Sequence, residues 1–397
     1  MTEIIIQVRD PTAGFEAAMV KAPFRESQQT RRQLDSPCAC EDIAHQAKKV
    51  RRLSSLRGSV WLRTRGADWT VYATVRGVCV RIPDFNDVLL ARRRIRPYLQ
   101  RTPMHSYPAV NELIGAEVFI KHENHQPVGS FKVRGGINLI SQLSEEERAR
   151  GVIAASTGNH GQSVSYAARL FDVKARIVVP EAANPGKVAA MKGMGAEVIF
   201  HGERFDQARL YCEGLAAEHG YRYIHSGDEP LLIAGVATEA LEMIEDQPGL
   251  DVIFVPVGGG SGAAGVCIAG NSLDPRIRII GVQSEAAPAA YQSWLQKRLV
   301  EAPNRTFAEG LATGTAFALP QAILWELLKE FVLVSEASIM QAMVWMIERA
   351  HSLVEAAGAS SLAAAYGMRD ELAGKKIALV CSGGNTSIEH LKQALSR

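Results

Sequence analysis

Ser130-Phe131-Lys132-Val133-Arg134-Gly135-Gly136 places one lysine among small and apolar residues. The stretch follows an extended segment, residues 117–121, and precedes a run with helical periodicity. A lysine at such a turn can lose its water shell and stay close to neutral, which makes its amine a nucleophile. Because most lysines are solvated surface charges, Lys132 becomes a candidate site residue only through the motifs that accompany it.

An alternation of strand and helix patterns fills the chain from about residue 87 onward. Strands are predicted at 117–121, 151–155, 174–179, 197–201, 221–225, 251–257, 278–283, 331–334 and 376–381. Helices are predicted at 132–143, 160–171, 185–194, 204–219, 232–246, 262–271, 337–351 and 359–373. Many of the strands are rich in Val and Ile and apolar on both faces, which is typical of parallel strands covered by helices. The predicted fold class is α/β with open parallel sheets, preceded by a helix from Asn86 or Asp87 to about Tyr98.

The composition excludes several classes of protein. The 397 residues are 47% hydrophobic and carry a formal net charge of +2, which allows two or three domains and does not indicate nucleic-acid or membrane-surface binding. The sequence has no apolar run of about 18 residues and no secretory signal pattern. Six scattered cysteines favour the cytoplasm over a disulfide framework. Cys38 and Cys40 lack a second ligand pair that would complete a metal site.

The first 86 residues differ from the rest of the chain. Residues 1–80 hold 13 Lys and Arg against 8 Asp and Glu, with basic pairs such as Arg31-Arg32 and poor hydrophobic periodicity. One or two short strands are predicted, at Trp61-Leu62 and at residues 71–75. Residues 1–86 are expected to be a poorly structured extension or the product of a start codon placed too far upstream, and the alternative is a basic interaction arm.

A first glycine-rich turn is Ala155-Ser156-Thr157-Gly158-Asn159-His160-Gly161, which follows a predicted strand and opens a predicted helix. Backbone N–H groups at such a helix start form an anion site, and Asn159 and His160 add side-chain donors. Ser156 and Thr157 can also be plain helix N-caps. The turn is therefore a candidate anion-binding loop.

A second turn is Pro256-Val257-Gly258-Gly259-Gly260-Ser261-Gly262-Ala263-Ala264-Gly265. Residues 260–265 match G-x-G-x-x-G, and Glu285 follows 20 residues later, as in a dinucleotide-binding fingerprint. Three consecutive glycines at 258–260 equally describe a loop around one phosphate. Taken alone, this turn fits both the dinucleotide-binding turn of an oxidoreductase and a loop that binds a single phosphate group.

The third turn, Cys381-Ser382-Gly383-Gly384-Asn385, ends the last predicted strand. Ligands in open α/β sheets bind at the carboxyl ends of strands, so the three turns and the segment with Lys132 are expected to converge. A dehydrogenase has no evident use for this lysine. An aldehyde cofactor with a phosphate needs an amine, a glycine cup, a donor to its ring oxygen and a partner for its ring nitrogen.

Four motifs, in this order, resemble those of the fold-type II pyridoxal-phosphate enzymes, the group that includes the tryptophan synthase β chain. They are residues 129–136, 156–162, 258–262 and 382–385. The resemblance runs from about Asp87 to the end and is greatest to the threonine and serine dehydratases. It implies pyridoxal 5′-phosphate in a cleft between two parallel-sheet domains, a large one of residues 87–152 and 232–397 and a small one of residues 153–231.

The resemblance also implies roles for single residues. Lys132 attaches the cofactor and later takes the α-proton of the substrate, and Phe131 lies against the cofactor ring. The phosphate is held by Gly258, Gly259, Gly260, Ser261 and Gly262. Asn159 binds the ring hydroxyl oxygen, and Ser382 faces the ring nitrogen. The substrate carboxylate is bound by Ser156, Thr157, Gly158, Asn159 and His160. Glu355 stands where many relatives have an acid near the ring, and its alternative is a carboxylate at a helix end.

Three departures from the family pattern limit the expected activity. Racemising relatives carry a second serine where this chain has Thr157, so racemase activity is not expected. Positions that bind a divalent cation in some relatives align with Gln283, Ala287 and Ala289, and although Glu285 is a possible replacement, no required metal is expected. The chain ends soon after the last motif, so a C-terminal regulatory domain and feedback inhibition by isoleucine are not expected.

The sequence therefore predicts a pyridoxal-phosphate-dependent ammonia-lyase that converts L-threonine, and also L-serine, to a 2-oxo acid and ammonia. A hydroxyl partner at the ring nitrogen leaves that nitrogen largely unprotonated, which favours prompt loss of a β-leaving group. The alternatives are a 3-hydroxyaspartate dehydratase, a serine racemase, an oxidoreductase built on residues 260–265, and a homologue that only binds ligands. The predicted enzyme is a cytoplasmic homodimer that acts on a small amino acid and binds neither nucleic acid nor membranes.

Overall fold

The computed structural model describes residues 4–10, 14–16, 60–64, 70–75 and 78–396, and the chain forms two compact units, residues 1–82 and 83–397. The first unit contains a five-stranded antiparallel sheet in the order β2-β1-β3-β4-β5. Its strands are β1 (Ile4–Asp10), β2 (Gly14–Glu16), β3 (Val60–Thr64), β4 (Thr70–Val75) and β5 (Val78–Arg81). The strands predicted around residues 61 and 71–75 are confirmed. The expected lack of structure falls mostly on residues 17–59, outside the described residues.

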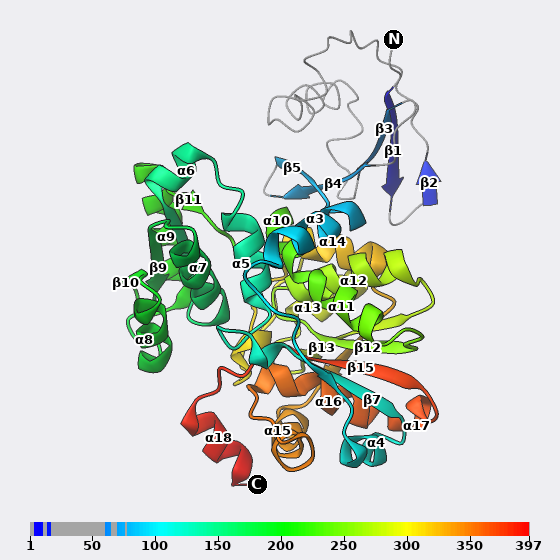
Figure 1. The fold of residues 1–397 in the computed structure, drawn as a ribbon. Helices are drawn as coiled ribbons and strands as arrows, with labels where there is room; N and C mark the ends of the chain where they lie inside the picture. Colours follow the sequence, from blue (N-terminus) through cyan, green and yellow to red (C-terminus); the bar gives the residue numbers. More distant parts are fainter. Residues whose placement is uncertain (1–3, 11–13, 17–59, 65–69, 76–77, 397) are drawn as a thin grey trace. The chain divides into compact units, whose positions relative to one another are not determined.

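Two separate sheets organise the second unit (Figure 1). The larger has the order β14 (Glu330–Val334), β13 (Arg278–Ser284), β12 (Val252–Pro256), β15 (Lys376–Cys381), β7 (Glu117–His122) and β6 (Met104–His105). The smaller has the order β10 (Glu197–Phe200), β9 (Ala175–Val179), β8 (Val152–Ala155) and β11 (Arg222–Tyr223). All neighbours are parallel except β6 and β7. The predicted α/β class with two parallel sheets is confirmed, and the residue limits of the two domains stay a prediction.

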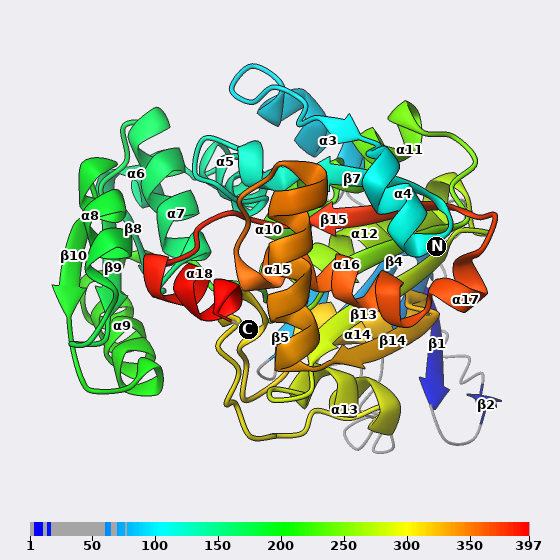
Figure 2. The ribbon, with the colours of Figure 1, turned by 90° about the horizontal axis from the view of Figure 1, so that it is seen from below.

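Helices cover both sheets, as strands that are apolar on both faces require. They are α3 (Phe85–Ile95), α4 (Pro108–Ile114), α5 (Lys132–Ile140), α6 (Glu145–Arg150), α7 (Asn159–Leu170), α8 (Pro185–Gly193), α9 (Phe205–His219), α10 (Pro230–Val236), α11 (Thr238–Asp246), α12 (Ser261–Leu273), α13 (Ala289–Gln296), α14 (Ala318–Leu327), α15 (Glu336–Ala350), α16 (Ala356–Gly367), α17 (Arg369–Leu372) and α18 (Ile388–Leu395). Two 3-10 turns, η2 (Glu123–His125) and η3 (Glu309–Leu311), complete the unit. The last helix, α18, lies beside α15 (Figure 2).

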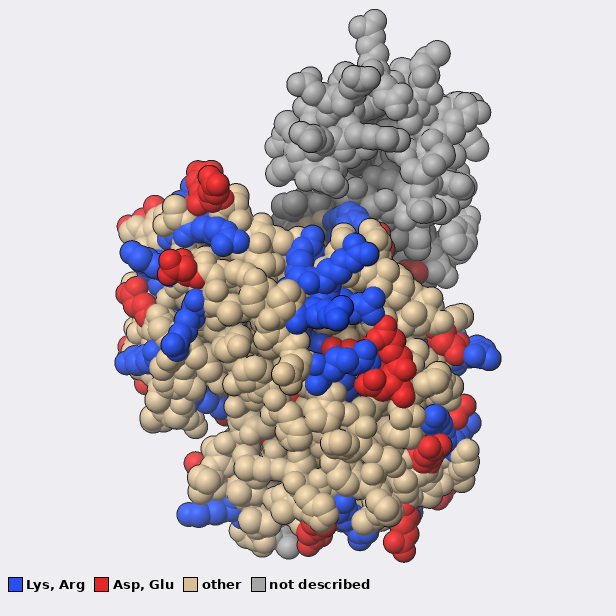
Figure 3. All heavy atoms as spheres, viewed as in Figure 1, with Lys and Arg blue, Asp and Glu red and all other residues tan. Residues whose placement is uncertain are grey.

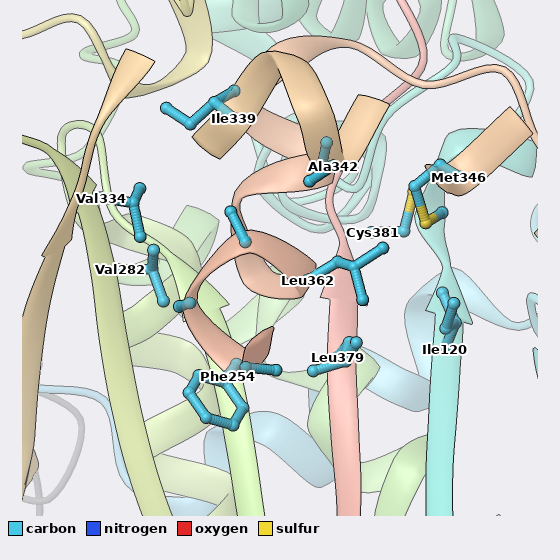
Figure 4. Close-up of a cluster of buried hydrophobic side chains, with 14 of the residues drawn as sticks. Ile120, Phe254, Val282, Val334, Ile339, Ala342, Met346, Leu362, Leu379 and Cys381 are labelled. Carbon is cyan, nitrogen blue, oxygen red and sulfur yellow. The ribbon is translucent and has the colours of Figure 1, made fainter. Parts of the chain in front are cut away.

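The main core lies between the six-stranded sheet and the helices α15 and α16 (Figure 4). Ile120, Phe254 and Leu379 come from three of its strands and are at most 2% exposed. They belong to one buried cluster with Leu362 of α16 and Met346 of α15. Each such side chain contributes about 1.5–3 kcal/mol through its removal from water, so this layer holds the carboxyl ends of the strands in fixed positions.

The first helix of the second unit begins earlier than the sequence predicts. Asp84, not Asn86 or Asp87, is the N-cap. Its side chain accepts a hydrogen bond from the Asp87 N–H at 3.1 Å, and the Asp87 carboxylate accepts one from the Asp84 N–H at 2.8 Å. This reciprocal capping box satisfies two backbone donors at once. The helix ends at Ile95 rather than Tyr98, because Pro97 has no N–H that could continue the helical hydrogen bonds.

The helix predicted at 232–246 is divided into α10 and α11 at Ala237. The hydroxyl of Thr238 donates to the Gly235 carbonyl at 2.7 Å, and such back-bonding bends helices. The sequence patterns did not indicate β6, α4, α6, α13, α14 or α18. The two-residue strand and the helices of six to ten residues are too short for a clear period.

Glycines allow α5 to pack deeply between α7 and α10. A Cβ atom on Gly136 would lie 2.3 Å from Ser163 Oγ, and one on Gly135 would lie 2.7 Å from the side chain of Leu232. From the other side, a Cβ on Gly235 would lie 2.7 Å from the Arg134 carbonyl oxygen. The two glycines after Lys132 therefore have a packing reason, and they place the first turn of α5 at the junction of the two sheets.

The charged surface agrees with the small net charge. Figure 3 shows basic side chains lying beside acidic ones. Two ion pairs contribute to this pattern, Arg92 with Glu245 and Arg101 with Asp246, each at 2.6 Å. In the described parts of the chain, no helix has both the length and the apolar character that a membrane crossing requires.

Candidate active site

Lys132 is the first residue of α5, and its amine reaches across to two other segments. Nζ donates hydrogen bonds to Ser261 Oγ at 2.7 Å and to the Ser226 carbonyl oxygen at 3.0 Å. The Lys132 carbonyl oxygen accepts a hydrogen bond from Ser163 Oγ at 2.7 Å. The backbone at Lys132 is therefore fixed to α7, while the amine points to the start of α12.

The surroundings of the Lys132 amine favour its neutral form. Both of its hydrogen-bond acceptors, Ser261 Oγ and the Ser226 carbonyl, are uncharged. Loss of water around the ammonium lowers the pKa of Lys132 from 10.5 to about 8, against an opposing effect from the charge of Glu239. A sizeable fraction of the amine is then unprotonated near neutral pH, as a nucleophile or proton acceptor requires.

The glycine turn after β12 lies directly at this amine. Ser261 is the first residue of α12, and Gly260 before it has a φ of 90°, in the region that favours glycine. A Cβ on Gly258 would lie 2.3 Å from the Gly310 carbonyl, and one on Gly259 would lie 2.1 Å from the Phe317 ring. Close neighbours therefore require glycine here. The turn presents the N-terminus of a 13-residue helix, which attracts anions.

Phe131, directly before α5, packs against the same glycine turn. A Cβ on Gly262 would be 3.0 Å from its ring, and Lys132 Nζ is 5.2 Å from the centre of that ring. The structure therefore brings together Phe131, Lys132 and residues 258–262, which the sequence analysis assigned to one cofactor.

Gly265 and Glu285, which belong to the dinucleotide-binding pattern, do not lie at the Lys132 amine. A Cβ on Gly265 would lie 2.8 Å from the Ala237 backbone nitrogen, so this glycine serves the contact of α12 with α11. Glu285 is exposed at the end of β13. Gln283, Ala287 and Ala289, the positions aligned with a cation site in some relatives, are buried. Among the described residues, no group of three His, Cys, Asp or Glu side chains could hold a metal ion; whether the enzyme requires a metal stays a prediction.

Asn159 begins α7 and is hydrogen-bonded to Glu355 and to the last glycine turn. Its Nδ2 donates to Glu355 Oε1 at 2.8 Å, and its Oδ1 accepts from Asn385 Nδ2 at 2.8 Å. Glu355 is the N-cap residue of α16, but its side chain makes no capping hydrogen bond. Burial raises the pKa of the Glu355 carboxyl, and the charge of Lys187 opposes that shift. Glu355 therefore belongs to the candidate site and does not cap its helix.

Ser156 and His160 have local structural partners. Ser156 Oγ accepts hydrogen bonds from the Gly161 N–H at 2.9 Å and the Gly158 N–H at 3.2 Å, which agrees with the capping alternative. His160 Nε2 faces the Ile224 carbonyl at 3.1 Å, and burial lowers the pKa of His160 to about 3. This histidine is therefore neutral at physiological pH, and its buried Nδ1 has no protein partner. Thr157 and Gly158 lie between these two residues at the start of α7.

The last glycine turn is joined to the lysine segment through the backbone. The Ser382 carbonyl accepts a hydrogen bond from the Phe131 N–H at 3.1 Å, and the Gly129 carbonyl accepts one from the Gly384 N–H at 2.9 Å. Ser382 itself is 5% exposed. The hydroxyl of Ser130 is fully buried without a protein partner. All four motifs therefore meet at one place, at the carboxyl ends of β7, β8, β12 and β15.

Three features of the site were missed by the sequence analysis. They are the Ser226 carbonyl beside Lys132, the buried Glu239 carboxyl, and the ion pair of Lys187 with Glu309. Ser226 follows β11, so the rule that ligands meet strand ends could have indicated it. No sequence signal marks the other two, because their positions depend on how helices cross.

Comparison with known proteins places the chain in a class. Residues 95–383 match the family described as pyridoxal-phosphate dependent enzyme. The chain belongs to this family, and its cofactor is pyridoxal phosphate.

Particular relatives are ammonia-lyases, dehydratases and racemases. The L-threo-3-hydroxyaspartate ammonia-lyase of Saccharomyces cerevisiae is 37% identical over 79% of this chain and 97% of its own length. The L-threonine ammonia-lyase of Thermotoga maritima is 37% identical over 78% of each chain. The serine racemase structure from Dictyostelium discoideum has a TM-score of 0.73 and 36% identity, and it covers 80% of this chain and 100% of its own.

The residues present fit this cofactor. The chain offers a lysine amine with only neutral acceptors, a helix N-terminus built of glycines beside it, and two buried polar atoms without protein partners, Ser130 Oγ and His160 Nδ1. Lys132 would hold the aldehyde carbon, and residues 258–262 would hold the phosphate.

Proposed function

We propose that this chain is a threonine ammonia-lyase that converts L-threonine to 2-oxobutanoate and ammonia, and L-serine to pyruvate and ammonia. The observation that carries the proposal is the Lys132 amine, held by two neutral acceptors at the point where four motifs meet. The 37% identity to an L-threonine ammonia-lyase over most of the chain supports the choice of substrate.

The proposed mechanism assigns one task to each group of residues. Bound pyridoxal phosphate supplies an electron-withdrawing ring that acidifies the α-proton of an attached amino acid. Lys132 accepts that proton at Nζ, and Ser261 Oγ and the Ser226 carbonyl orient the amine for the transfer. The residue 156–160 loop binds the substrate carboxylate through N–H groups at the start of α7. Asn159, fixed by Glu355 and Asn385, would hold the ring hydroxyl oxygen of the bound cofactor, and Ser382 would lie at its ring nitrogen.

Two other activities have a specific observation in their favour. A dicarboxylic substrate, 3-hydroxyaspartate, is favoured by the identity to the yeast enzyme. Serine racemisation is favoured by the Dictyostelium structure, but it needs a second base on the opposite face of the substrate. This chain offers the more crowded hydroxyl of Thr157 at the position where racemising relatives have serine, so we place racemisation below elimination.

The first test is the absorption spectrum. The purified protein with pyridoxal phosphate should absorb at about 410 nm, and borohydride should fix the cofactor to Lys132. Assays of 2-oxo acid and ammonia should then give the highest kcat/KM with L-threonine. Turnover of L-threo-3-hydroxyaspartate alone would overturn the substrate assignment, and D-serine formation from L-serine that exceeds elimination would make the protein a racemase.

We further propose a cytoplasmic homodimer, with domains at 87–152 plus 232–397 and at 153–231. The described cysteines Cys212, Cys267 and Cys381 are free and buried, which suits a reducing compartment. Light scattering should give a mass near 86 kDa, twice the 43.1 kDa of one chain. Deletion of residues 1–82 should leave turnover intact, and loss of folding in that truncation would show that the first unit is structural.

A further inference from the structure

An ion pair connects the two halves of the second unit at the candidate site. Lys187 lies on α8, beside the four-stranded sheet, and its Nζ donates to Glu309 Oε2 on η3, which packs against α16. The Lys187 side chain is only 12% exposed, whereas that of Glu309 is 45% exposed. The lysine therefore lies largely inside the structure, and the glutamate approaches it from the solvent side.

The Lys187 ammonium borders the loop proposed to bind the substrate carboxylate. A Cβ on Gly158, at the centre of that loop, would lie 3.9 Å from Lys187 Nζ. Lys187 and Glu309 also line one small cavity together with Glu355 and Asn385, and both of the latter are hydrogen-bonded to Asn159. One cation is thus placed among the groups that surround the proposed substrate.

Local helix preference does not explain this lysine. Lys187 is the third residue of α8, where the positive end of the helix dipole disfavours a cation. The Asn184 side chain already accepts hydrogen bonds from the Gly186 and Lys187 N–H groups, so the helix start is capped without it. An ion pair with an exposed partner contributes little to stability.

The carboxylate loop itself lacks a positive charge. His160 is neutral at physiological pH, and the Ser156 hydroxyl is used inside the loop. A carboxylate that enters the site loses much of its water, and a nearby cation offsets part of that cost.

We propose that Lys187 is a carboxylate-binding residue of the substrate site, and that Glu309 is the internal carboxylate which the substrate displaces from it. The inference rests on the proposed function, because it requires an amino acid at the residue 156–160 loop. Glu309 then has a regulating effect: it keeps the ammonium in place and lowers the apparent affinity for every substrate by competition.

The test uses two amino-acid ligands that have no β-leaving group. L-Alanine carries the carboxylate and L-alaninamide does not, and binding of either is read from the change in cofactor absorption. In Lys187→Met, the Kd of L-alanine should rise roughly 10- to 100-fold, as expected for loss of a hydrogen bond to a charged group, and that of L-alaninamide should change less than about twofold. Lys187→Arg should restore most of the L-alanine affinity, and Lys192→Met, an exposed position on the same helix, should change neither constant.

Glu309→Gln provides a variant whose expected effect has the opposite sign. Removal of the competing carboxylate should tighten L-alanine binding several-fold, and poor folding cannot imitate a gain of affinity. Equal weakening of both ligands in Lys187→Met would give the ion pair a purely structural role and overturn the inference, as would unchanged binding of L-alanine. A wild-type protein that binds neither ligand would overturn the proposed function as well, which distinguishes the two failures.

Discussion

Two cationic side chains of the same helix, Lys132 and Arg134, have opposite electrostatic surroundings. Arg134 is 1% exposed and donates to Glu123 at 2.7 and 2.8 Å and to Glu242 at two distances of 2.7 Å. Lys132 has only a hydroxyl and a carbonyl as acceptors. Two residues along a helix correspond to a rotation of about 200°, so the two side chains leave α5 on opposite faces.

The difference between the two side chains shows what stabilises the charged form of a buried cation. The carboxylates raise the pKa of Arg134 well above its ordinary value, although burial acts in the other direction. Lys132 lacks such partners, and burial lowers its pKa to about 8. A second lysine, Lys121, is fully buried and joins the arginine side of this comparison through Glu242 at 2.7 Å. The helix therefore separates a structural ion network from a reactive amine.

Replacement of Lys132 should have the largest effect on activity and little effect on folding. Lys132→Ala removes the attachment point and the proton acceptor, so turnover of L-threonine should fall by at least about 10³-fold. The band at about 410 nm should disappear. Because no carboxylate loses a partner, the free energy of unfolding should not decrease, as measured in urea. Full turnover in this variant would show that another residue does the chemistry.

Replacement of Arg134 should have the reverse effect, a loss of folding stability. Arg134→Met leaves the Glu123 and Glu242 carboxylates buried with Lys121 as their remaining cation, and removal of one partner from a buried ion pair costs about 3–5 kcal/mol. Urea unfolding measures this loss. The matched control is Arg92→Met, whose pair with Glu245 is 42% and 37% exposed and should contribute at most about 1 kcal/mol. Equal losses in the two variants would contradict the assignment of the Arg134 network to the fold.

The site around Lys132 was predictable from the sequence, and the ion network around Arg134 was not. The lysine, the three glycine turns and nine strands follow from local patterns and from the rule that ligands meet strand ends. The Arg134 network joins residues up to 121 positions apart, through Lys121 and Glu242. Such contacts depend on the depth at which α5, α10 and α11 pack, which Gly135 and Gly235 set through contacts that no periodicity reveals.

Glu239 lies between the two electrostatic regions and should make stability depend on pH. Both of its carboxylate oxygens are buried without a protein partner, and burial raises its pKa well above 4.5. The folded state therefore keeps a proton that the unfolded chain releases above pH of about 4.5. Since the native state then binds more protons, the free energy of unfolding falls as pH rises above this value.

Glu239→Gln should remove that dependence. Glutamine is neutral in both states, so the variant should gain stability over the native protein, and the gain should grow between pH 5 and pH 8. Thermal unfolding across this range measures it, with the exposed Glu285→Gln as the control for loss of one charge. If the stability of Glu239→Gln and that of the native protein changed in parallel with pH, the Glu239 carboxyl would have a partner that keeps it ionised.

The smallest expected effect concerns the Lys132 amine itself. Attachment of pyridoxal phosphate to cofactor-free protein requires a neutral amine, so its rate should rise with pH and reach half its limit at about pH 8, far below the ordinary lysine value of 10.5. The charge of an ionised Glu239 would raise the pKa of Lys132, but burial raises the pKa of this carboxyl and keeps it protonated. Glu239→Gln should therefore leave the midpoint unchanged, as measured by the return of the absorption band at about 410 nm. A midpoint that moves to lower pH in this variant would show that Glu239 is ionised beside Lys132, and the separation of the reactive amine from charged carboxylates would then be contradicted.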